Sequence, residues 1–204
     1  MLQTNTVEKS TLDLLIKLQS IPLLSHLRLV GGTALALQIG HRKSIDLDFF
    51  GTIEETGLEI THEIKQYGIV NVEIMLDRKS IKMFTIENVK VDIVNYPYDW
   101  IDPLIESEGV KMAGKKDIAP MKIAAITNRG SKKDFVDIYF LLQEFSLQEL
   151  LQFYSNKFPD ASPYNAIRSL VYFEDAELQV MPEMVVPITW EEVKTTLRAA
   201  VEKL

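Results

Sequence analysis

Two short blocks of sequence decide the fold of this chain: Val30-Gly31-Gly32-Thr33-Ala34-Leu35-Ala36-Leu37 and Ile45-Asp46-Leu47-Asp48-Phe49-Phe50. The first block predicts a short strand over residues 27–30 that meets two glycines and continues as a helix over residues 33–39. In the second block apolar and acidic residues alternate, which predicts a strand with one apolar face and one carboxylate face. The expected order of strand, glycine turn, helix and strand is that of a mixed α/β fold.

The residue types in these blocks suit the binding of a metal ion and a phosphate. Asp46 and Asp48 would point the same way from one strand, with Cα atoms about 6.5 Å apart, and such carboxylates repel each other unless a cation lies between them. Mg²⁺ usually takes one or two protein carboxylates together with phosphate oxygens and water. Gly31 and Gly32 have no Cβ atom, so backbone N–H groups can approach a phosphate at the start of the helix. Alone, each motif is more often a solvated edge or a turn, so the prediction depends on their combination.

The rest of the first half predicts further helices and strands. Helices are expected over residues 7–20 and 54–66. Strands are expected over residues 70–76, 81–86 and 89–95. Pro97 and Pro103 frame a connection that follows the last strand. We therefore predict an antiparallel or mixed sheet with flanking helices.

The second half of the chain predicts helices. Asp117 is expected to cap a helix that runs to about residue 128, and Asp134 to open another that runs to about residue 144. After residue 147, four prolines break the chain into two or three more helices. Residues 1–110 and 111–204 are expected to form the two parts of one compact unit.

Composition excludes several classes of protein. The chain has 204 residues, of which 47% are hydrophobic and 25% charged, as in an ordinary globular protein. The absence of cysteine excludes thiol catalysis, thiolate metal sites and a disulfide scaffold. The first residues lack the pattern of a secretory signal, and no apolar run is long enough to span a membrane. We therefore expect a cytoplasmic protein.

The charges are distributed unevenly along the chain. The formal net charge of −7 argues against indiscriminate coating of nucleic acid. Residues 111–133, however, hold seven Lys and Arg against one acid, Asp117. This stretch favours a surface that faces phosphate, with a solvated helix and loop as the alternative.

The two opening blocks resemble the signature of the nucleotidyltransferase superfamily, a Gly-Gly or Gly-Ser, a short helix, and Asp-x-Asp on a strand. More narrowly, the chain resembles the AbiEii/AbiGii abortive-infection toxin family. The narrower resemblance adds residues 117–126, which begin Asp-Ile-Ala-Pro-Met-Lys, and residues 129–139, Arg-Gly-Ser-Lys-Lys-Asp-Phe-Val-Asp-Ile-Tyr. It covers about residues 27–145.

This resemblance implies an α+β fold, with a nucleotidyltransferase-like mixed β-sheet, flanking helices and a helical C-terminal part. It also implies transfer of a nucleotide from a nucleoside triphosphate (NTP) to an acceptor, with Mg²⁺ or Mn²⁺ and with release of pyrophosphate. The expected acceptor is RNA, tRNA in particular, and the expected role is that of a toxin with a cognate antitoxin. The alternatives are an inactive nucleotide- or RNA-binding module of the same fold and a nucleotidyltransferase that acts on small molecules.

The resemblance also implies roles for individual residues. Asp46 and Asp48 would bind the metal with a third acid, for which Asp92 is the candidate and Glu73 the competitor. The expected catalytic residues are Asp46, Asp48, Lys122, Asp134 and Asp137. The expected nucleotide-binding residues are Gly31, Gly32, Thr33, Arg42, Ser44 and Lys122.

Several of these residues have plainer alternatives. Asp134 is a good helix cap, and Asp137 can pair with Lys133 or Arg129 on the helix surface. His41 is predicted to be a polar turn residue. For the aromatic residues 96, 98 and 100, a loop packed on the core is favoured over a platform that stacks a base.

Overall fold

The computed structural model, which describes residues 1–204, joins seven strands into one mixed sheet. The strands are β1 (Arg28–Val30), β2 (Leu47–Gly51), β3 (Val72–Asp77), β4 (Ile81–Ile86), β5 (Val89–Asn95), β6 (Ile105–Ser107) and β7 (Val110–Met112). Their order across the sheet is β3-β4-β5-β2-β1-β7-β6. The pairs β2–β5 and β1–β7 are parallel and the other neighbours antiparallel, so the predicted mixed sheet is confirmed.

Helices precede, interrupt and follow the strands. They are η1 (Thr4–Thr6), α1 (Lys9–Ser20), α2 (Gly31–Ile39), α3 (Gly57–Gln66), α4 (Lys115–Arg129), α5 (Lys132–Leu141), α6 (Leu147–Lys157), α7 (Pro163–Leu170), α8 (Glu174–Glu177) and α9 (Trp190–Val201). None of them combines the length and the apolar character that crossing a membrane requires.

The chain divides into two compact units, which we call the sheet unit and the helical unit. The sheet unit consists of Met1–Gly40, Ser44–Pro97 and Leu104–Ala113. The helical unit consists of His41–Lys43, Tyr98–Pro103 and Gly114–Leu204. Two short segments from the first half of the sequence therefore belong to the helical unit.

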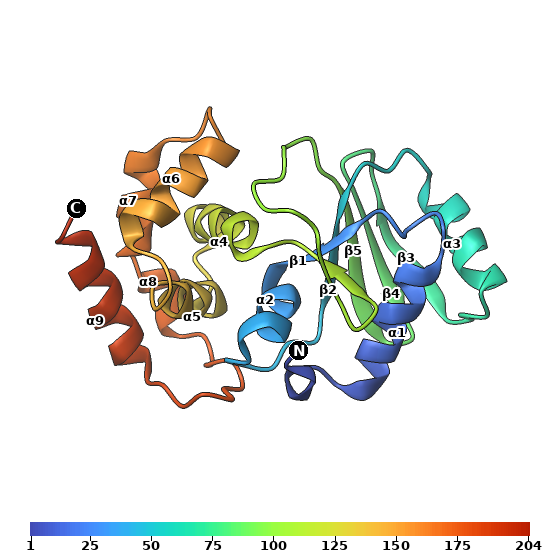
Figure 1. Cartoon of the computed structure of the whole chain (residues 1–204), viewed down its shortest axis with the longest axis horizontal. Helices are drawn as coiled ribbons and strands as arrows, with labels where there is room; N and C mark the ends of the chain where they lie inside the picture. Colours follow the sequence, from blue (N-terminus) through green and yellow to red (C-terminus); the bar gives the residue numbers. More distant parts are fainter. The chain divides into compact units, whose positions relative to one another are not determined.

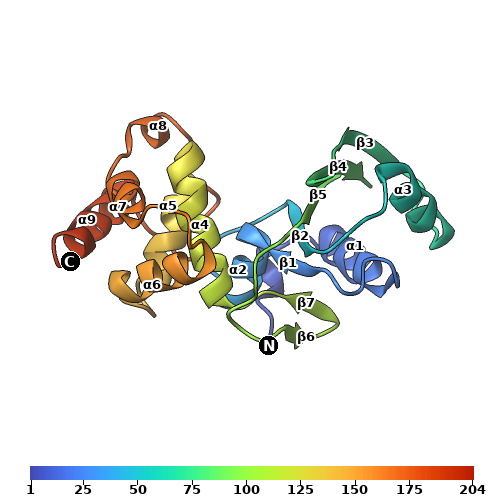
Figure 2. The ribbon, with the colours of Figure 1, turned by 90° about the horizontal axis from the view of Figure 1, so that it is seen from above.

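In the sheet unit, helices cover both faces of the sheet. Figures 1 and 2 show α1 and α3 against one face and α2 against the other. Alternation along β2 buries Leu47 and Phe49 in the core, and the adjacent β5 buries Val91 and Ile93 beside them. The intervening aspartates point to the opposite face, as the sequence pattern predicts.

The strands β4 and β5 have the predicted bounds, but the elements beside the glycines differ from the prediction. Helix α2 begins at Gly31 rather than at residue 33, and β2 begins at Leu47, so Asp46 lies just before the strand. The pairing of β1 with β2 ends at Val30 and Asp48, because the chain turns into α2 after Val30. Asp46 therefore lies outside the residues that β1 and β2 pair in register.

A hairpin that the prediction missed follows the connection framed by Pro97 and Pro103. Strands β6 and β7 pair with Ile105 opposite Met112. Glu108 and Gly109 form the turn between them, and both have positive φ, 52° and 79°. Two such residues are typical of tight hairpin turns, and Gly109 was the available signal.

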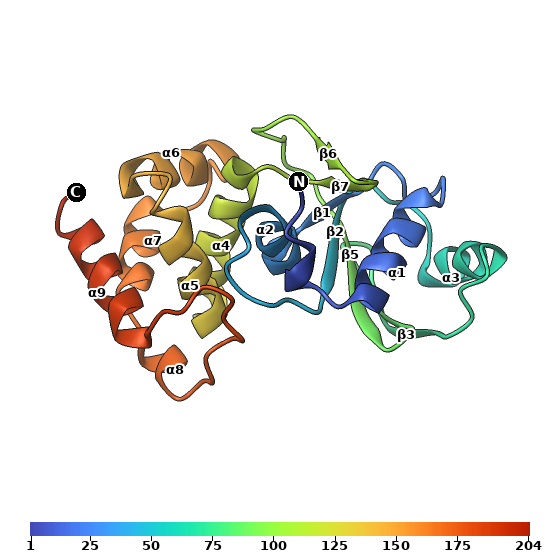
Figure 3. The ribbon, with the colours of Figure 1, turned by 60° about the horizontal axis from the view of Figure 1, so that its bottom comes forward.

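In the helical unit, α4 packs against α5, α6 and α7, and α9 packs against α5 and α7 (Figure 3). Four helices follow residue 147 rather than two or three, and the additional one, α8, has only four residues. The segment His41–Lys43 is held by backbone hydrogen bonds to residues 183–186, and Arg42 forms a β-bridge with Met184.

The two aspartates expected to begin helices do not act as caps. Gly114 precedes α4 and Ser131 precedes α5, so Asp117 and Asp134 each lie inside the first turn. The Asp117 carboxylate accepts hydrogen bonds from the backbone N–H groups of Ile101 and Asp102 instead. A cap prediction from local sequence fails here because each carboxylate has a stronger partner elsewhere in the unit.

Candidate active site

Two of the predicted acids meet at the centre of the sheet. Asp48 on β2 and Asp92 on β5 are direct register partners in a parallel pair, so their side chains share one face of the sheet. Asp92 is 8% exposed, and its Oδ1 atom is buried without a hydrogen-bond partner. Glu73 lies on β3, two strands away from β5 at the edge of the sheet. The fold thus places Asp92, and not Glu73, beside Asp48.

Gly31 lets the chain pass close to Asp48. Its φ is +69°, and a Cβ atom at this position would overlap Asp48 Oδ2 and lie 3.3 Å from its Cγ. Only a glycine fits both the backbone conformation and this approach. The turn between β1 and α2 therefore lies against a carboxylate of the site, as the two sequence blocks predict.

Thr33 and Ser44 bind the segment that precedes β2. The hydroxyl of Thr33, which is buried, donates to the backbone carbonyl of Asp46 and lies 2.8 Å from Ser44 Oγ. Thr33 therefore fixes the backbone of Asp46 and contacts Ser44, which lies in the same segment.

Lys90 is a member of this site that the sequence analysis missed. Its Nζ donates to Asp92 Oδ2 at 2.7 Å, and 48% of its side chain is exposed. Burial lowers the pKa of the Lys90 ammonium, but the hydrogen bond to Asp92 and the charges of Asp92, Asp48 and Asp46 outweigh this effect and raise the pKa. The signal was available, because a residue two positions before Asp92 on a strand shares its face.

The acids of the sheet unit fit a magnesium ion in chemistry and number. No group of three or more His, Asp or Glu side chains is arranged to bind a metal by itself. Mg²⁺, however, is usually held by one or two carboxylates together with substrate phosphates. Asp48 and Asp92 provide such a pair, and one oxygen of Asp92 has no other partner. Gly31, which has no Cβ, allows the Asp48 carboxylate to take this position. We call Asp46, Asp48 and Asp92 the carboxylate face.

The later motif residues form a separate group inside the helical unit, which we call the buried cluster: His41, Arg42, Lys122, Asp134 and Asp137. At its centre is Lys122, which is 4% exposed. Its Nζ lies 2.9 Å from Asp134 Oδ1 and 2.6 Å from Asp137 Oδ2. Burial lowers the pKa of Lys122, but the two carboxylates outweigh it and raise the pKa. The partner expected for a buried lysine is therefore a pair of carboxylates.

Asp137 is the most strongly bound member of the buried cluster. Arg42 donates to it through two atoms, Nε to Oδ1 at 2.7 Å and Nη2 to Oδ2 at 2.9 Å. Burial raises the pKa of Asp137, but the charges of Arg42 and Lys122 and the hydrogen bonds from Arg42 and His41 hold it well below the usual range. The alternative pairing of Asp137 with Lys133 or Arg129 is therefore wrong.

Three side chains donate hydrogen bonds to Asp134, which lies in the first turn of α5. Lys122, Arg129 and Ser131 all donate to its carboxylate, at 2.9, 3.1 and 2.9 Å. Burial raises its pKa, but the charges of Lys122 and Arg129 outweigh burial and lower it. Asp134 thus links the end of α4 to the start of α5, and its predicted catalytic role, like those of Lys122 and Asp137, stays a prediction.

His41 is fully buried rather than a residue of an exposed polar turn. Burial is the largest effect on its pKa and lowers it despite the neighbouring Asp137, so the ring is neutral at pH 7. Its Nε2 lies 2.8 Å from Asp137 Oδ1, and a carboxylate only accepts hydrogen bonds, so Nε2 carries the proton. Nδ1 then has only an acceptor lone pair, and it has no partner.

The basic stretch of residues 111–133 does not form the continuous free surface that its sequence indicates. Four of its charges are in ion pairs, Lys115 with Glu144, Lys116 with Asp102, and Lys122 and Arg129 with Asp134. Lys132 is buried and donates to the carbonyl of Glu177. The neutralising acids come from other parts of the sequence, which a local count of charges does not include.

The three aromatic residues near the end of β5 pack against other rings and a lysine. Tyr96 contacts Phe50 in the sheet unit. In the helical unit, Tyr98 lies edge-on to Phe158, and Lys157 Nζ lies 5.0 Å from the centre of the Trp100 ring. The packed arrangement that the sequence analysis favoured holds for Tyr96 and Trp100, which are half-buried, whereas Tyr98 is 42% exposed.

Comparison with known proteins identifies the family. The model of a family described as "Nucleotidyl transferase AbiEii toxin, Type IV TA system" matches residues 13–183. The chain belongs to this AbiEii family. The resemblance seen in the sequence motifs is thereby confirmed, and the chain is a nucleotidyltransferase by family.

One relative and two solved structures match nearly the whole of this AbiEii member. The uncharacterized protein aq_aa25 of Aquifex aeolicus (strain VF5) is 34% identical over 207 residues, with 97% of each chain covered. The crystal structure of JHP933 from Helicobacter pylori matches with a TM-score of 0.63 at 18% identity, over 97% of this chain and 92% of that one. MenT4, a nucleotidyltransferase toxin of Mycobacterium tuberculosis H37Rv, matches with a TM-score of 0.54 at 14% identity, over 96% and 82%. These structures share the fold.

Proposed function

We propose that this AbiEii member transfers a nucleotide from an NTP to an RNA acceptor, tRNA in particular, with Mg²⁺ or Mn²⁺ as cofactor. One observation carries the proposal: Asp48 and Asp92 lie side by side on one face of a parallel strand pair, beside a glycine turn at the start of a helix. A buried carboxylate oxygen without a partner is costly, and a bound cation would satisfy it.

Each residue of the sheet unit has a part in this proposal. Asp48 and Asp92 would hold the metal, and Asp46 lies one residue before β2, where Thr33 fixes its backbone. Gly31 and Gly32 would admit triphosphate oxygens to the N-terminus of α2. The metal, when bound, would neutralise charge on the triphosphate and on the attacking oxygen. Positioning and charge neutralisation are the main sources of rate acceleration in such transfers.

The acceptor part of the proposal is supported by the family and by an exposed site on α7. Arg168 lies over the ring of Tyr164, with 5.7 Å between the guanidinium carbon and the ring centre, and Tyr164 is 66% exposed. A neighbouring cavity of about 330 Å³ is lined by Thr127, Asn165, Arg168, Ser169 and Tyr172. Arginine and tyrosine together offer a phosphate contact and a stacking surface for single-stranded RNA.

The experiment that tests the reaction is incubation with each labelled NTP, Mg²⁺ and tRNA, followed by separation of the products by size. We expect labelled RNA with the unaltered chain, and a loss of at least about 100-fold with Asp48→Asn or Asp92→Asn, because removal of a metal-binding carboxylate removes the charge that the transition state requires. Glu73→Gln, which changes an exposed acid on β3, is the matched control and should retain activity.

Other outcomes would contradict parts of the proposal. A label that moves only to a small molecule would exclude an RNA acceptor. Binding of NTP without any release of pyrophosphate would identify an inactive nucleotide-binding module. Activity that survives Asp48→Asn would show that the carboxylate face is not the active site.

The toxin role is tested separately. The AbiEii family is described as part of type IV toxin–antitoxin systems, and we propose that this chain has a cognate antitoxin. Expression of the unaltered chain should arrest the growth of a bacterial host, and expression of Asp48→Asn should not. Co-expression with the product of the adjacent gene should restore growth, and arrest by Asp48→Asn would contradict the link between toxicity and nucleotide transfer.

A further inference from the structure

A lysine, Lys90, pairs with an acid of the carboxylate face, and the register of β2 and β5 fixes the place of Lys90 in the sheet. Leu47 is opposite Val91 and Asp48 is opposite Asp92. Asp46 directly precedes Leu47, and Lys90 directly precedes Val91. Side chains two residues apart on a strand share a face, so Lys90 and Asp92 project to the same side as Asp48.

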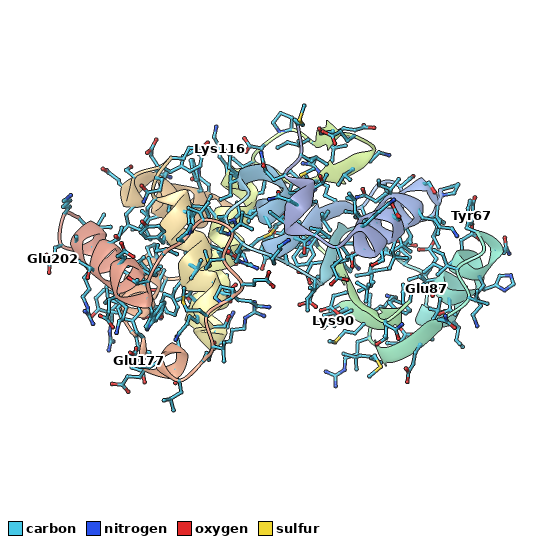
Figure 4. All side chains as sticks on the ribbon, turned by 90° about the horizontal axis from the view of Figure 1, so that it is seen from below. Tyr67, Glu87, Lys90, Lys116, Glu177 and Glu202 are labelled. Atoms are coloured by element: carbon cyan, nitrogen blue, oxygen red, sulfur yellow. The ribbon has the colours of Figure 1, made fainter.

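The Lys90 side chain reaches this face from solvent. Figure 4 labels Lys90, and its stem is half-exposed while its Nζ lies 2.7 Å from Asp92 Oδ2. The charges of Asp92, Asp48 and Asp46 all attract the ammonium. An ammonium on a flexible four-carbon stem can leave such a contact without any change in the backbone.

Competition for one carboxylate gives Lys90 a specific role. The Lys90 ammonium occupies Asp92 Oδ2, an oxygen of the residue that would hold a metal ion. A divalent cation at the same carboxylate would compete with the ammonium for its oxygen atoms. The two would also repel each other, because both are positively charged.

We propose that Lys90 is a tethered counterion, which contacts Asp92 when no metal is present and must release it when a divalent cation binds. This inference rests on the proposed function, since it assumes that the carboxylate face binds a metal. Lys90 then weakens the binding of a free metal ion. An NTP carries a metal and also offers phosphate oxygens to the released ammonium, so Lys90 favours binding of the metal together with the NTP.

The test is the affinity for Mn²⁺ of the full-length chain without nucleotide, measured by calorimetry and by the electron paramagnetic resonance signal of free Mn²⁺. Lys90→Met should bind Mn²⁺ about tenfold more tightly than the unaltered chain, because a repelling charge beside the ion is gone. Lys90→Arg, which keeps the charge, should bind within about twofold of the unaltered chain. Lys79→Met removes the same charge from an exposed turn of the same unit and should also have no effect.

A second measurement tests the coupling to the nucleotide. A non-hydrolysable NTP should tighten Mn²⁺ binding to the unaltered chain several-fold more than it tightens binding to Lys90→Met. Equal Mn²⁺ affinities of the unaltered chain and Lys90→Met, or equal tightening by the nucleotide, would overturn the inference.

Failure of the inference is distinguishable from failure of the proposed function. If the unaltered chain binds Mn²⁺ and loses it in Asp48→Asn, the metal site is real, and the Lys90 variants decide the inference alone. If neither the unaltered chain nor Lys90→Met binds Mn²⁺, both the metal-dependent function and the role of Lys90 are wrong.

Discussion

Gly31 is the residue that connects backbone conformation to the acids of the site. We predict that Gly31→Ala loses stability and activity together. The positive φ costs an alanine about 1 kcal/mol, and the new Cβ would displace the Asp48 carboxylate. Thermal unfolding followed by circular dichroism and the nucleotide transfer assay measure the two effects.

Gly109→Ala separates these two causes. Gly109 also has a positive φ. The atom nearest to a new Cβ there would be Ile16 Cγ2 at 3.8 Å, which is an ordinary contact distance. This control should lose a similar amount of stability and no activity. If both variants were equally active, the close approach of Gly31 to Asp48 would have no functional meaning.

Asp137 is the residue on which the buried cluster depends. We predict that Asp137→Asn lowers the free energy of unfolding by about 3–5 kcal/mol, because Arg42 and Lys122 would keep buried charges with one partner fewer. Urea unfolding followed by tryptophan fluorescence measures this change in the helical unit, where both tryptophans, Trp100 and Trp190, lie.

Glu144→Gln is the matched comparison for Asp137→Asn. It breaks the exposed ion pair with Lys115 and should cost less than about 1 kcal/mol. Equal effects of the two substitutions would show that the buried cluster contributes no more to stability than a surface ion pair.

At the scale of elements, a buried ion pair attaches a connecting segment to two helices. The side chains of Asp117 on α4 and Lys157 on α6 are both fully buried, and Lys157 Nζ lies 2.6 Å from Asp117 Oδ1. Asp117 accepts from two backbone N–H groups of the segment Tyr98–Pro103, and Lys157 donates to the carbonyl of Asp99. The pair therefore fixes this segment within the helical unit.

We predict that Lys157→Met loosens this segment. Hydrogen exchange at the amides of Ile101 and Asp102 should become at least about tenfold faster, because the Asp117 carboxylate loses its counterion and the segment loses one anchor. Lys194→Met removes a lysine with exposed carboxylate partners in the same unit and should leave these amides protected. Unchanged exchange in Lys157→Met would mean that the hydrogen bonds from Asp117 suffice.

At the scale of the whole molecule, the shifted pKa values predict how stability depends on pH. The folded pKa values of Asp134 and Asp137 are lowered, so their contribution is complete above about pH 4 and is lost as the pH falls through the lowered values. The folded pKa of Lys122 is raised, so its contribution is complete below about pH 10 and is lost as the pH rises through the raised value.

His41 adds a loss of stability at mildly acidic pH. Its folded pKa is lowered by burial, so an unfolded histidine binds a proton below about pH 6.5 while the folded one does not. Stability of the helical unit should therefore fall between pH 7 and pH 5. Urea unfolding across this range measures the slope, and His41→Gln should flatten it. An equal slope in both proteins would contradict a neutral buried His41.

Local sequence patterns predict the local parts of the site. Alternation with a period of two predicts that Asp48 and Asp92 stand on the polar face of strands whose other face is buried, and β4 and β5 have the predicted bounds. The glycine turn, its helix and the strand after it are readable because each depends on backbone preferences of a few consecutive residues.

The tertiary structure decided which charged groups meet. Strand order, which no local pattern states, places Asp92 rather than Glu73 beside Asp48. Asp137 pairs with Arg42, 95 residues away in sequence, and not with the lysines of its own helix. The basic stretch loses its free charge to Glu144 and Asp102 in the same way. Periodicity is a property of neighbouring residues, whereas ion pairs depend on the path of the whole chain, and so only the fold determined the partners.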